Sequence, residues 1–101
     1  MVKHIILWQL KDDLQPEQKA AVTAGIKQGL EGLQGRIPGL TEIRVVADHL
    51  LPTSNADVML DCTLESFDAL KDYAVHPLHV AVADGKIRPF TKTRVCIDYE
   101  V

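Results

Sequence analysis

The sequence contains only two cysteines and no apolar run long enough to cross a membrane. A membrane-spanning helix needs about 20 apolar residues, whereas a typical apolar run here covers only residues 4–8. Met1 leads directly into residues 2–4, without the long apolar segment of a secretory leader. Two cysteines in such a chain are expected to be reduced thiols. We therefore expect a cytoplasmic protein without a membrane partner.

Basic residues are also in short supply. The chain has 11 Lys and Arg against 14 Asp and Glu, which gives a formal net charge of −3 and a pI of about 5.7. A nucleic-acid-binding protein normally carries a basic stripe, so we expect no nucleic-acid partner. With 47% apolar and 25% charged residues in 101, the composition is typical of one folded domain, here residues 1–101.

Hydrophobic patterning predicts four strands and two helical regions. The predicted strands cover residues 2–11, 40–49, 56–65 and 91–101. A first helix begins at Pro16 and runs to about Gly35, with apolar residues at helical spacing. Ser66 is a good N-cap for a second helix, which Pro77 interrupts near His76. A short further helical piece is predicted from Pro77 to Asp84-Gly85.

The order βαββαβ predicts an α+β, ferredoxin-like sandwich with both helices on one face of the sheet. We expect the other face to be an apolar association surface with a charged rim, through which a homodimer forms. Its expected members are Ile5, Leu7, Met59, Cys96, Arg94, Asp61, Asp98 and Thr63. Within that set, Asp61 and Arg94 are candidates for an ion pair at the rim. The apolar face of the last strand is assigned Thr93, Val95, Ile97, Tyr99 and Val101.

The two cysteines are not expected to form a disulfide. In this topology Cys62 and Cys96 are two strands apart, about 10 Å across the sheet. Strand alternation also assigns their side chains to opposite faces.

Three glycines, Gly25, Gly29 and Gly32, fall inside the first predicted helix, where each costs roughly 1 kcal/mol relative to alanine. They indicate either close packing between this helix and the sheet or room beside the helix for a ligand. The sequence leaves both interpretations open.

Several kinds of chemical site are disfavoured. His76 and His79 are three residues apart, but Pro77 breaks the helical face that a metal site would need. No third His or Cys lies nearby in the sequence, and His4 is only a guess as a partner. We therefore expect no metal. Ser54 and Ser66 are typical of a loop and a helix cap, so no serine nucleophile is indicated. The glycines lie in a helix and form no phosphate-binding loop.

An acid–base pair remains. The break at Pro77 lets Tyr73 and His79 converge, and His4 shares a strand face with Ile6 and Trp8, toward the helices. A neutral imidazole accepts a proton near pH 7, while a phenol donates a hydrogen bond to a carbonyl or orients the imidazole. The alternative is structural: Tyr73 covers the core, and His79 binds a backbone carbonyl to close the loop.

These residues resemble the stress-responsive dimeric A/B barrel domain (Dabb) family over essentially the whole chain. The similarity rests on residues 2–6 (VKHII) with Lys11-Asp12, on 63–66 (TLES), on 73–80 (YAVHPLHV) and on 97–99 (IDY). It implies a ferredoxin-like protomer and a homodimeric α+β barrel.

The resemblance also implies two kinds of function. Many members are small stress-associated proteins without an assigned activity, which fits a homodimer that binds a small apolar ligand or serves as a stable structural protein. Some plant members are polyketide cyclases that close a ring by an intramolecular aldol step without a cofactor. For that chemistry His79 is the implied general base and Tyr73 the hydrogen-bond partner. The implied substrate-binding residues are His4, Ile6, Trp8, Ile26, Val58 and Leu60.

The sequence differs from those cyclases at two places. Val58 stands where they carry a further histidine, and Val22, Gly25 and Ile26 stand where aromatic rings line their pocket. The function hypotheses are therefore a stress-associated ligand-binding or structural dimer, and a cyclase, lyase or isomerase acting on a β-keto compound. A monooxygenase of the related barrel families, acting on haem or a quinol, has only the shared architecture in its favour.

Overall fold

The structure is a computed structural model that describes all 101 residues. The strands are β1 (Val2–Leu10), β2 (Leu40–Val46), β3 (Val58–Leu64) and β4 (Thr91–Glu100). The α-helices are α1 (Pro16–Glu31), α2 (Phe67–Val75) and α3 (Pro77–Val82). A π-helical turn, η1 (Ala83–Ile87), and a 3₁₀ turn, η2 (Arg88–Phe90), lead from α3 into β4.

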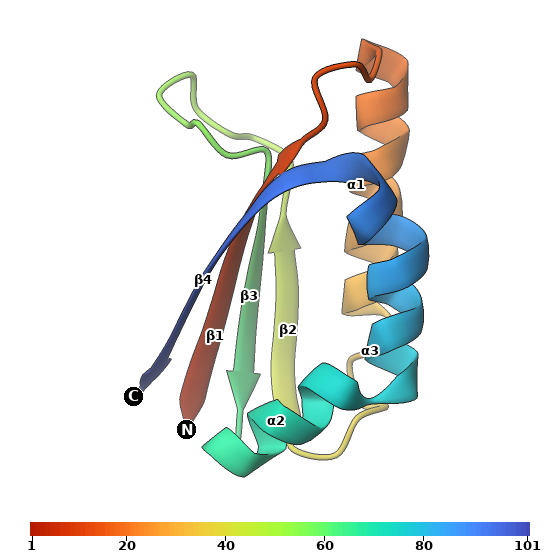
Figure 1. Ribbon diagram of the computed structural model, residues 1–101. Helices are drawn as coiled ribbons and strands as arrows, with labels where there is room; N and C mark the ends of the chain where they lie inside the picture. The colour runs from red at the N-terminus through yellow and green to blue at the C-terminus, as the bar shows by residue number, and fades with distance from the viewer.

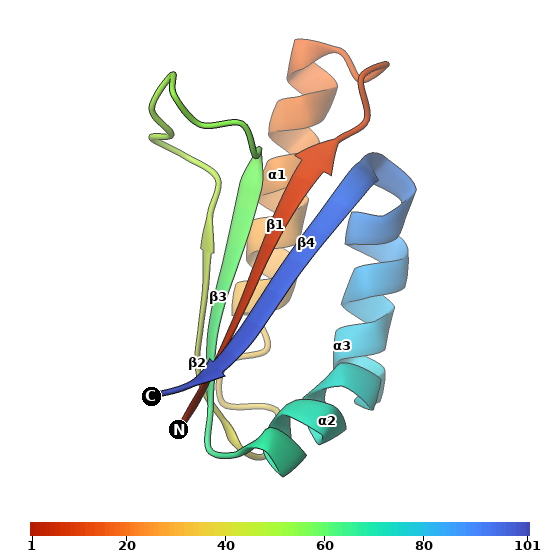
Figure 2. The ribbon, with the colours of Figure 1, turned by 60° about the vertical axis from the view of Figure 1, so that its left-hand side comes forward.

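The four strands form one antiparallel sheet in the order β2-β3-β1-β4. All helices lie on one side of this sheet, and the opposite side is uncovered (Figure 1, Figure 2). The predicted α+β, ferredoxin-like fold is therefore confirmed. None of the helices has the length and apolar character that spanning a bilayer would require.

The core lies between the sheet and the helix layer. Strands β1 and β3 turn every second side chain toward the helices, which buries alternate residues along both strands. From the other side, α1 contributes Ile26 and Leu30, both without exposed surface. The apolar cluster comprises 18 buried residues and is continuous from β2 to η1.

Two predicted helix boundaries differ from the structure. Helix α1 ends at Glu31, because residues 32–35 form turns and Gly35 has a left-handed backbone with a φ of 77°. The last helical piece does not end at Asp84-Gly85: the chain passes through these residues as the π-helical turn and continues to Phe90. The predicted break at His76 is confirmed, with φ −64° and ψ 132° before Pro77.

The close approach made by the α1 glycines is to another helix. A Cβ on Gly29 would lie 2.9 Å from Cγ1 of Val82 in α3, which is inside contact distance. The small residue therefore lets α1 and α3 pack side by side above the sheet, whereas the sequence left open packing against the sheet or room for a ligand.

The orientation of β4 differs from the prediction. Antiparallel pairing places Ile5 opposite Ile97 and Leu7 opposite Val95, and residues paired in this way share a face. The uncovered face therefore carries Val95, Ile97 and Tyr99. Residues 94, 96 and 98 lie on the helix side, opposite Trp8, Ile6 and His4. Assigning Arg94, Cys96 and Asp98 to the association surface was wrong.

Two smaller predictions change with it. Asp61 pairs with Lys3 (Nζ–Oδ1, 2.7 Å) and Arg44 (Nη2–Oδ2, 3.2 Å), so the ion pair with Arg94 is not formed. Cys62 and Cys96 face the same side, because they are opposite His4 and Ile6 on β1. Both thiols are nevertheless free, since β1 separates their strands.

Gly39, just before β2, gives a prediction for stability. Its φ is 82°, and an added Cβ would lie 2.6 Å from Cβ of Ala69. We expect Gly39→Ala to lower the free energy of unfolding by about 2–4 kcal/mol, because backbone strain and overpacking act together. Gly85 has open space around its Cα and an ordinary φ, so Gly85→Ala is the control in urea unfolding. Equal stability of both variants would contradict the prediction.

Candidate active site

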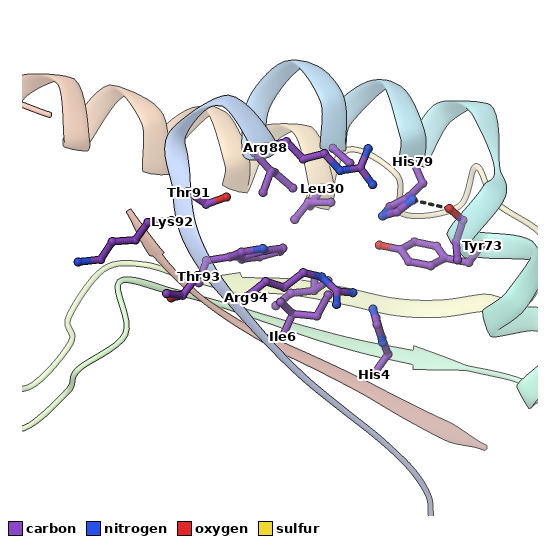
Figure 3. A pocket seen from close by; sticks show the side chains of 15 residues that line it. His4, Ile6, Leu30, Tyr73, His79, Arg88, Thr91, Lys92, Thr93 and Arg94 are labelled. Atoms are coloured by element: carbon purple, nitrogen blue, oxygen red, sulfur yellow. Dashed lines mark hydrogen bonds between the residues drawn. The ribbon is translucent and has the colours of Figure 1, made fainter. Parts of the chain in front are cut away.

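A cavity of about 280 Å³ opens between the sheet and the segment α2–α3–η1–η2. Figure 3 shows His79 and Tyr73 at one end of it and Thr91, Lys92 and Thr93 at the other. The walls are mainly apolar, with charged groups along β4 and η2. The 15 lining residues are His4, Ile6, Trp8, Leu30, Leu60, Tyr73, Ala74, His79, Ala83, Ile87, Arg88, Thr91, Lys92, Thr93 and Arg94.

His79 is fixed in one tautomer by the break between α2 and α3. Its Nδ1 lies 3.2 Å from the carbonyl oxygen of Ala74, the dashed contact in Figure 3. A carbonyl only accepts hydrogen bonds, so Nδ1 carries the hydrogen when the imidazole is neutral. The second ring nitrogen, Nε2, is then unprotonated and free to accept a proton.

The surroundings favour the neutral imidazole. Burial lowers the pKa of His79 from its ordinary value of 6.5, although the hydrogen bond to Ala74 partly opposes this. The positive charges of Arg88 and Arg94 lower the pKa further. His79 is therefore largely deprotonated at neutral pH, the state that a general base requires.

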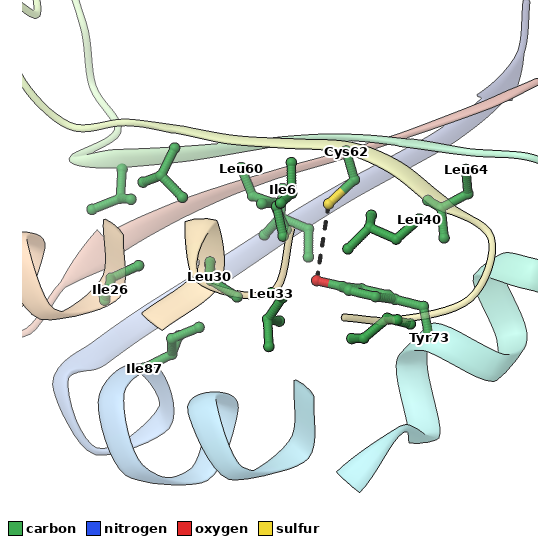
Figure 4. Close-up of a cluster of buried hydrophobic side chains, with 14 of the residues drawn as sticks. Ile6, Ile26, Leu30, Leu33, Leu40, Leu60, Cys62, Leu64, Tyr73 and Ile87 are labelled. Atoms are coloured by element: carbon green, nitrogen blue, oxygen red, sulfur yellow. Dashed lines mark hydrogen bonds between the residues drawn. The ribbon is translucent and has the colours of Figure 1, made fainter. Parts of the chain in front are cut away.

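Tyr73 lies against the imidazole of His79, with 4.4 Å between ring centroids. The residue has no solvent-exposed surface, and its hydroxyl points toward the cavity (Figure 3). The thiol of Cys62 donates to this oxygen at a long 3.9 Å, as Figure 4 shows. Burial raises the pKa of Tyr73 far above its usual 10, so the phenol keeps its proton. Tyr73 can thus donate a hydrogen bond but cannot act as a base.

Cys62 is a buried core residue beneath Tyr73 and not a nucleophile. Burial raises the pKa of its thiol to about 12. The thiolate, which is the reactive form, is therefore absent at neutral pH.

His4 is the third of the predicted polar site residues in the wall, with His79 and Tyr73. It is 6% exposed, its Nδ1 is hydrogen-bonded to the carboxylate of Asp98, and its ring lies edge-on to Tyr73 at 6.0 Å. The predicted trio of His4, Tyr73 and His79 is therefore brought together, although β1, α2 and α3 supply one residue each. His76, by contrast, caps α3 by accepting from the backbone of Leu78 at 3.1 Å.

Six of the eight predicted site residues line the cavity: His4, Ile6, Trp8, Leu60, Tyr73 and His79. The other two, Ile26 and Val58, lie in the hydrophobic core away from the lining. Sequence reasoning missed the residues that η2 and β4 contribute, notably Arg88, Lys92 and Arg94. The sequence did contain a signal for these basic residues: residues 85–97 include four basic residues and no acidic one.

One group of side chains has the donor types of a metal site. Nδ1 of His4, Sγ of Cys96 and a carboxylate oxygen of Asp98 all lie within 4.8 Å of one another. Two of these donors are already joined in the hydrogen bond between His4 and Asp98. The contacts within the group therefore need no ion to explain them.

Comparison with known proteins identifies the fold and its family. The family model described as "Stress responsive A/B Barrel Domain" matches residues 2–101. The chain belongs to the stress-responsive A/B barrel (Dabb) family. The resemblance seen in the sequence is thereby confirmed, and comparison with curated proteins gave no match.

Solved structures similar to this A/B barrel chain include enzymes and proteins of unknown function. A dimeric ferredoxin-like protein of unknown function from Bacteroides fragilis is 33% identical, with a TM-score of 0.91 over 99% of this chain and 95% of that one. A dimeric one from Thermobifida fusca is 27% identical (TM-score 0.79, 99% and 90%). The hydroxynitrile lyase from Passiflora edulis shares the fold at 19% identity (TM-score 0.70, 97% and 90%).

Proposed function

We propose that this A/B barrel protein is a homodimeric acid–base enzyme that removes a proton next to a carbonyl of a small β-keto compound. The observation that carries the proposal is the hydrogen bond from His79 to the Ala74 carbonyl. This bond leaves Nε2 as an unprotonated base at the wall of a largely apolar cavity. A hydroxynitrile lyase with the same fold supports the view that this architecture accommodates chemistry at a carbonyl.

The reaction would use side chains alone. Nε2 of His79 takes the proton from the carbon between the two carbonyl groups, and the electron pair moves onto a carbonyl oxygen. The hydroxyl of Tyr73 donates a hydrogen bond to that oxygen and stabilises the enolate. In a ring closure, the carbanion carbon then attacks a second carbonyl of the same molecule, and the imidazolium returns the proton to the new alkoxide. Without a second carbonyl, the proton returns to carbon.

The dimer in this proposal forms through the uncovered face of the sheet. Val95 and Ile97 are each 61% exposed, and Tyr99 is 45% exposed, although all three belong to a regular strand. The similar proteins from Bacteroides fragilis and Thermobifida fusca are described as dimeric. Packing of two such faces about a two-fold axis would bury these side chains. The free thiols suit the cytoplasmic location that we propose.

The alternative is a stress-associated protein that binds a ligand or is purely structural. In that case the hydrogen bond of His79 would only close the connection between α2 and α3. The lowered pKa of His79 and the cavity beside it favour the enzymatic proposal.

The test is exchange of the α-proton of ethyl benzoylacetate for deuterium, followed by NMR against pH. We expect catalysed exchange that rises with pH and levels off, with a midpoint below 6.5, because the base must be neutral and its pKa is lowered. Spontaneous exchange in buffer without protein is subtracted at each pH. Absence of catalysed exchange, or a midpoint above 7, would contradict His79 as the base.

A further inference from the structure

The charged residues that line the cavity are all basic. Arg88, Lys92 and Arg94 line it together with two histidines, and no aspartate or glutamate is among the lining residues. The whole chain has a net charge of −3, so this concentration runs against the overall charge. Three cations around a small cavity attract anions and disfavour a cationic ligand.

Two of the three cations are already neutralised. Arg88 pairs with Asp84 one turn earlier, and Lys92 Nζ lies 2.7 Å from Oδ1 of Asp12. Arg94 has no such partner: no carboxylate lies within 4.0 Å of its guanidinium. The acid nearest to it along its strand face, Asp98, is hydrogen-bonded to His4.

The position of Arg94 relates it to the acid–base residues. It lies opposite Trp8 on the helix side of the sheet. In Figure 3 its guanidinium extends along the floor of the cavity, on the sheet side, toward the end at which His4, Tyr73 and His79 lie. A ligand whose carbonyl lies at His79 therefore has this guanidinium on the sheet side of the same cavity. A planar guanidinium matches a carboxylate with two parallel hydrogen bonds.

We propose that the cavity selects small keto acids, with Arg94 as the residue that recognises the ligand's carboxylate. The keto group of this ligand is inferred from the proposed function, on which this part of the proposal rests. Its carboxylate is inferred independently, from the basic residues in the cavity wall. The volume of about 280 Å³ lies at the lower end of ligand cavities, which suits a compact keto acid. Arg94 is a specificity residue in this assignment and takes no part in proton transfer.

The experiment compares an acid with its neutral ester. Benzoylacetate and methyl benzoylacetate share the β-keto group and the phenyl ring and differ in the carboxylate charge. We expect the wild-type protein to bind the acid about tenfold more tightly in calorimetry, and Arg94→Gln to reduce this ratio below about twofold. Arg94→Lys should keep part of the preference, because it retains the charge without the planar fork.

A matched control is available in Arg36, an exposed arginine that makes no ion pair and does not line the cavity. Arg36→Gln removes the same charge from the protein and should keep the tenfold ratio. Equal affinity for acid and ester, no binding of either, or an unchanged ratio in Arg94→Gln would overturn the proposal. Displacement of benzoylacetate by an equal concentration of inorganic phosphate would also overturn it, because it would indicate a general anion site.

The same ratio is measured on His79→Gln, in which proton transfer is removed but Arg94 is retained. If the wild type and His79→Gln both prefer the acid but the wild type catalyses no α-proton exchange, the enzymatic function is refuted and the carboxylate site stands. If the wild type catalyses exchange but binds acid and ester equally, the carboxylate site is refuted and the enzymatic function stands. The two proposals therefore fail separately.

Discussion

Replacing His79 with alanine is expected to reduce α-proton exchange by about 10²–10⁴-fold, the usual contribution of a general base. Tyr73 cannot take over the role, because burial raises its pKa and the phenol keeps its proton. The measurement is the rate of deuterium exchange into ethyl benzoylacetate at neutral pH, with wild type and variant at equal protein concentration.

The fold should survive this change. His79 is only partly buried, and it makes one side-chain hydrogen bond, to the carbonyl of an exposed residue, Ala74. The loss of that bond costs about 1 kcal/mol in the free energy of unfolding. His76→Ala is the matched control, because it removes a neighbouring histidine that only caps α3. It should lower stability by about 1 kcal/mol and leave exchange intact. Full exchange activity in His79→Ala, or its loss of folding, would support the structural alternative.

The second large effect is expected from Val95→Asp on the uncovered face of β4. If two such faces pack together, the two-fold axis introduces two buried, unpaired carboxylates into one interface. Dissociation should then be favoured by at least about 100-fold, since an uncompensated buried charge costs about 3–5 kcal/mol. Analytical ultracentrifugation over a range of concentrations would show a dimer for the wild type and a monomer for the variant.

Val75→Asp separates this effect from a general effect of added charge. Val75 is 73% exposed at the end of α2, in the helix layer, whereas Val95 is 61% exposed on the opposite side of the molecule. The control variant should remain dimeric. Dimers of Val95→Asp as tight as those of the wild type would exclude this face as the interface.

The parts of the fold that the sequence predicted are those in which pattern and burial coincide. In β3 every second residue is apolar and buried, so the pattern alone assigns its faces. His76 could be placed between two helices because it precedes a proline, which restricts its backbone whatever surrounds it. His4 could be assigned to the helix side because it shares a face of β1 with Ile6 and Trp8, and these alternate positions are buried in the structure.

Strand β4 shows why the rest could not be predicted. Alternation separates Val95 and Ile97 from Arg94 and Cys96, but it does not say which set faces the helices. For an inner strand the apolar set faces the core, whereas β4 is an edge strand whose first residues line the cavity. Its apolar set therefore faces outward. The pairing of Leu7 with Val95 decides which set faces outward, and alternation within β4 alone does not contain that register.

The π-helical turn η1 has a consequence for how this cavity can diversify. Such a turn contains one residue more than an α-helical turn, and one residue corresponds to about 100° of rotation. The extra residue therefore determines the direction in which the side chains of Ile87 and Arg88 point, and so their place in the cavity wall. Insertion or deletion of a single residue here would rotate a different side chain into that wall, while His79 and the sheet remain in place. Ligand preference can therefore evolve by indels in one short segment, separately from the residues proposed to move protons.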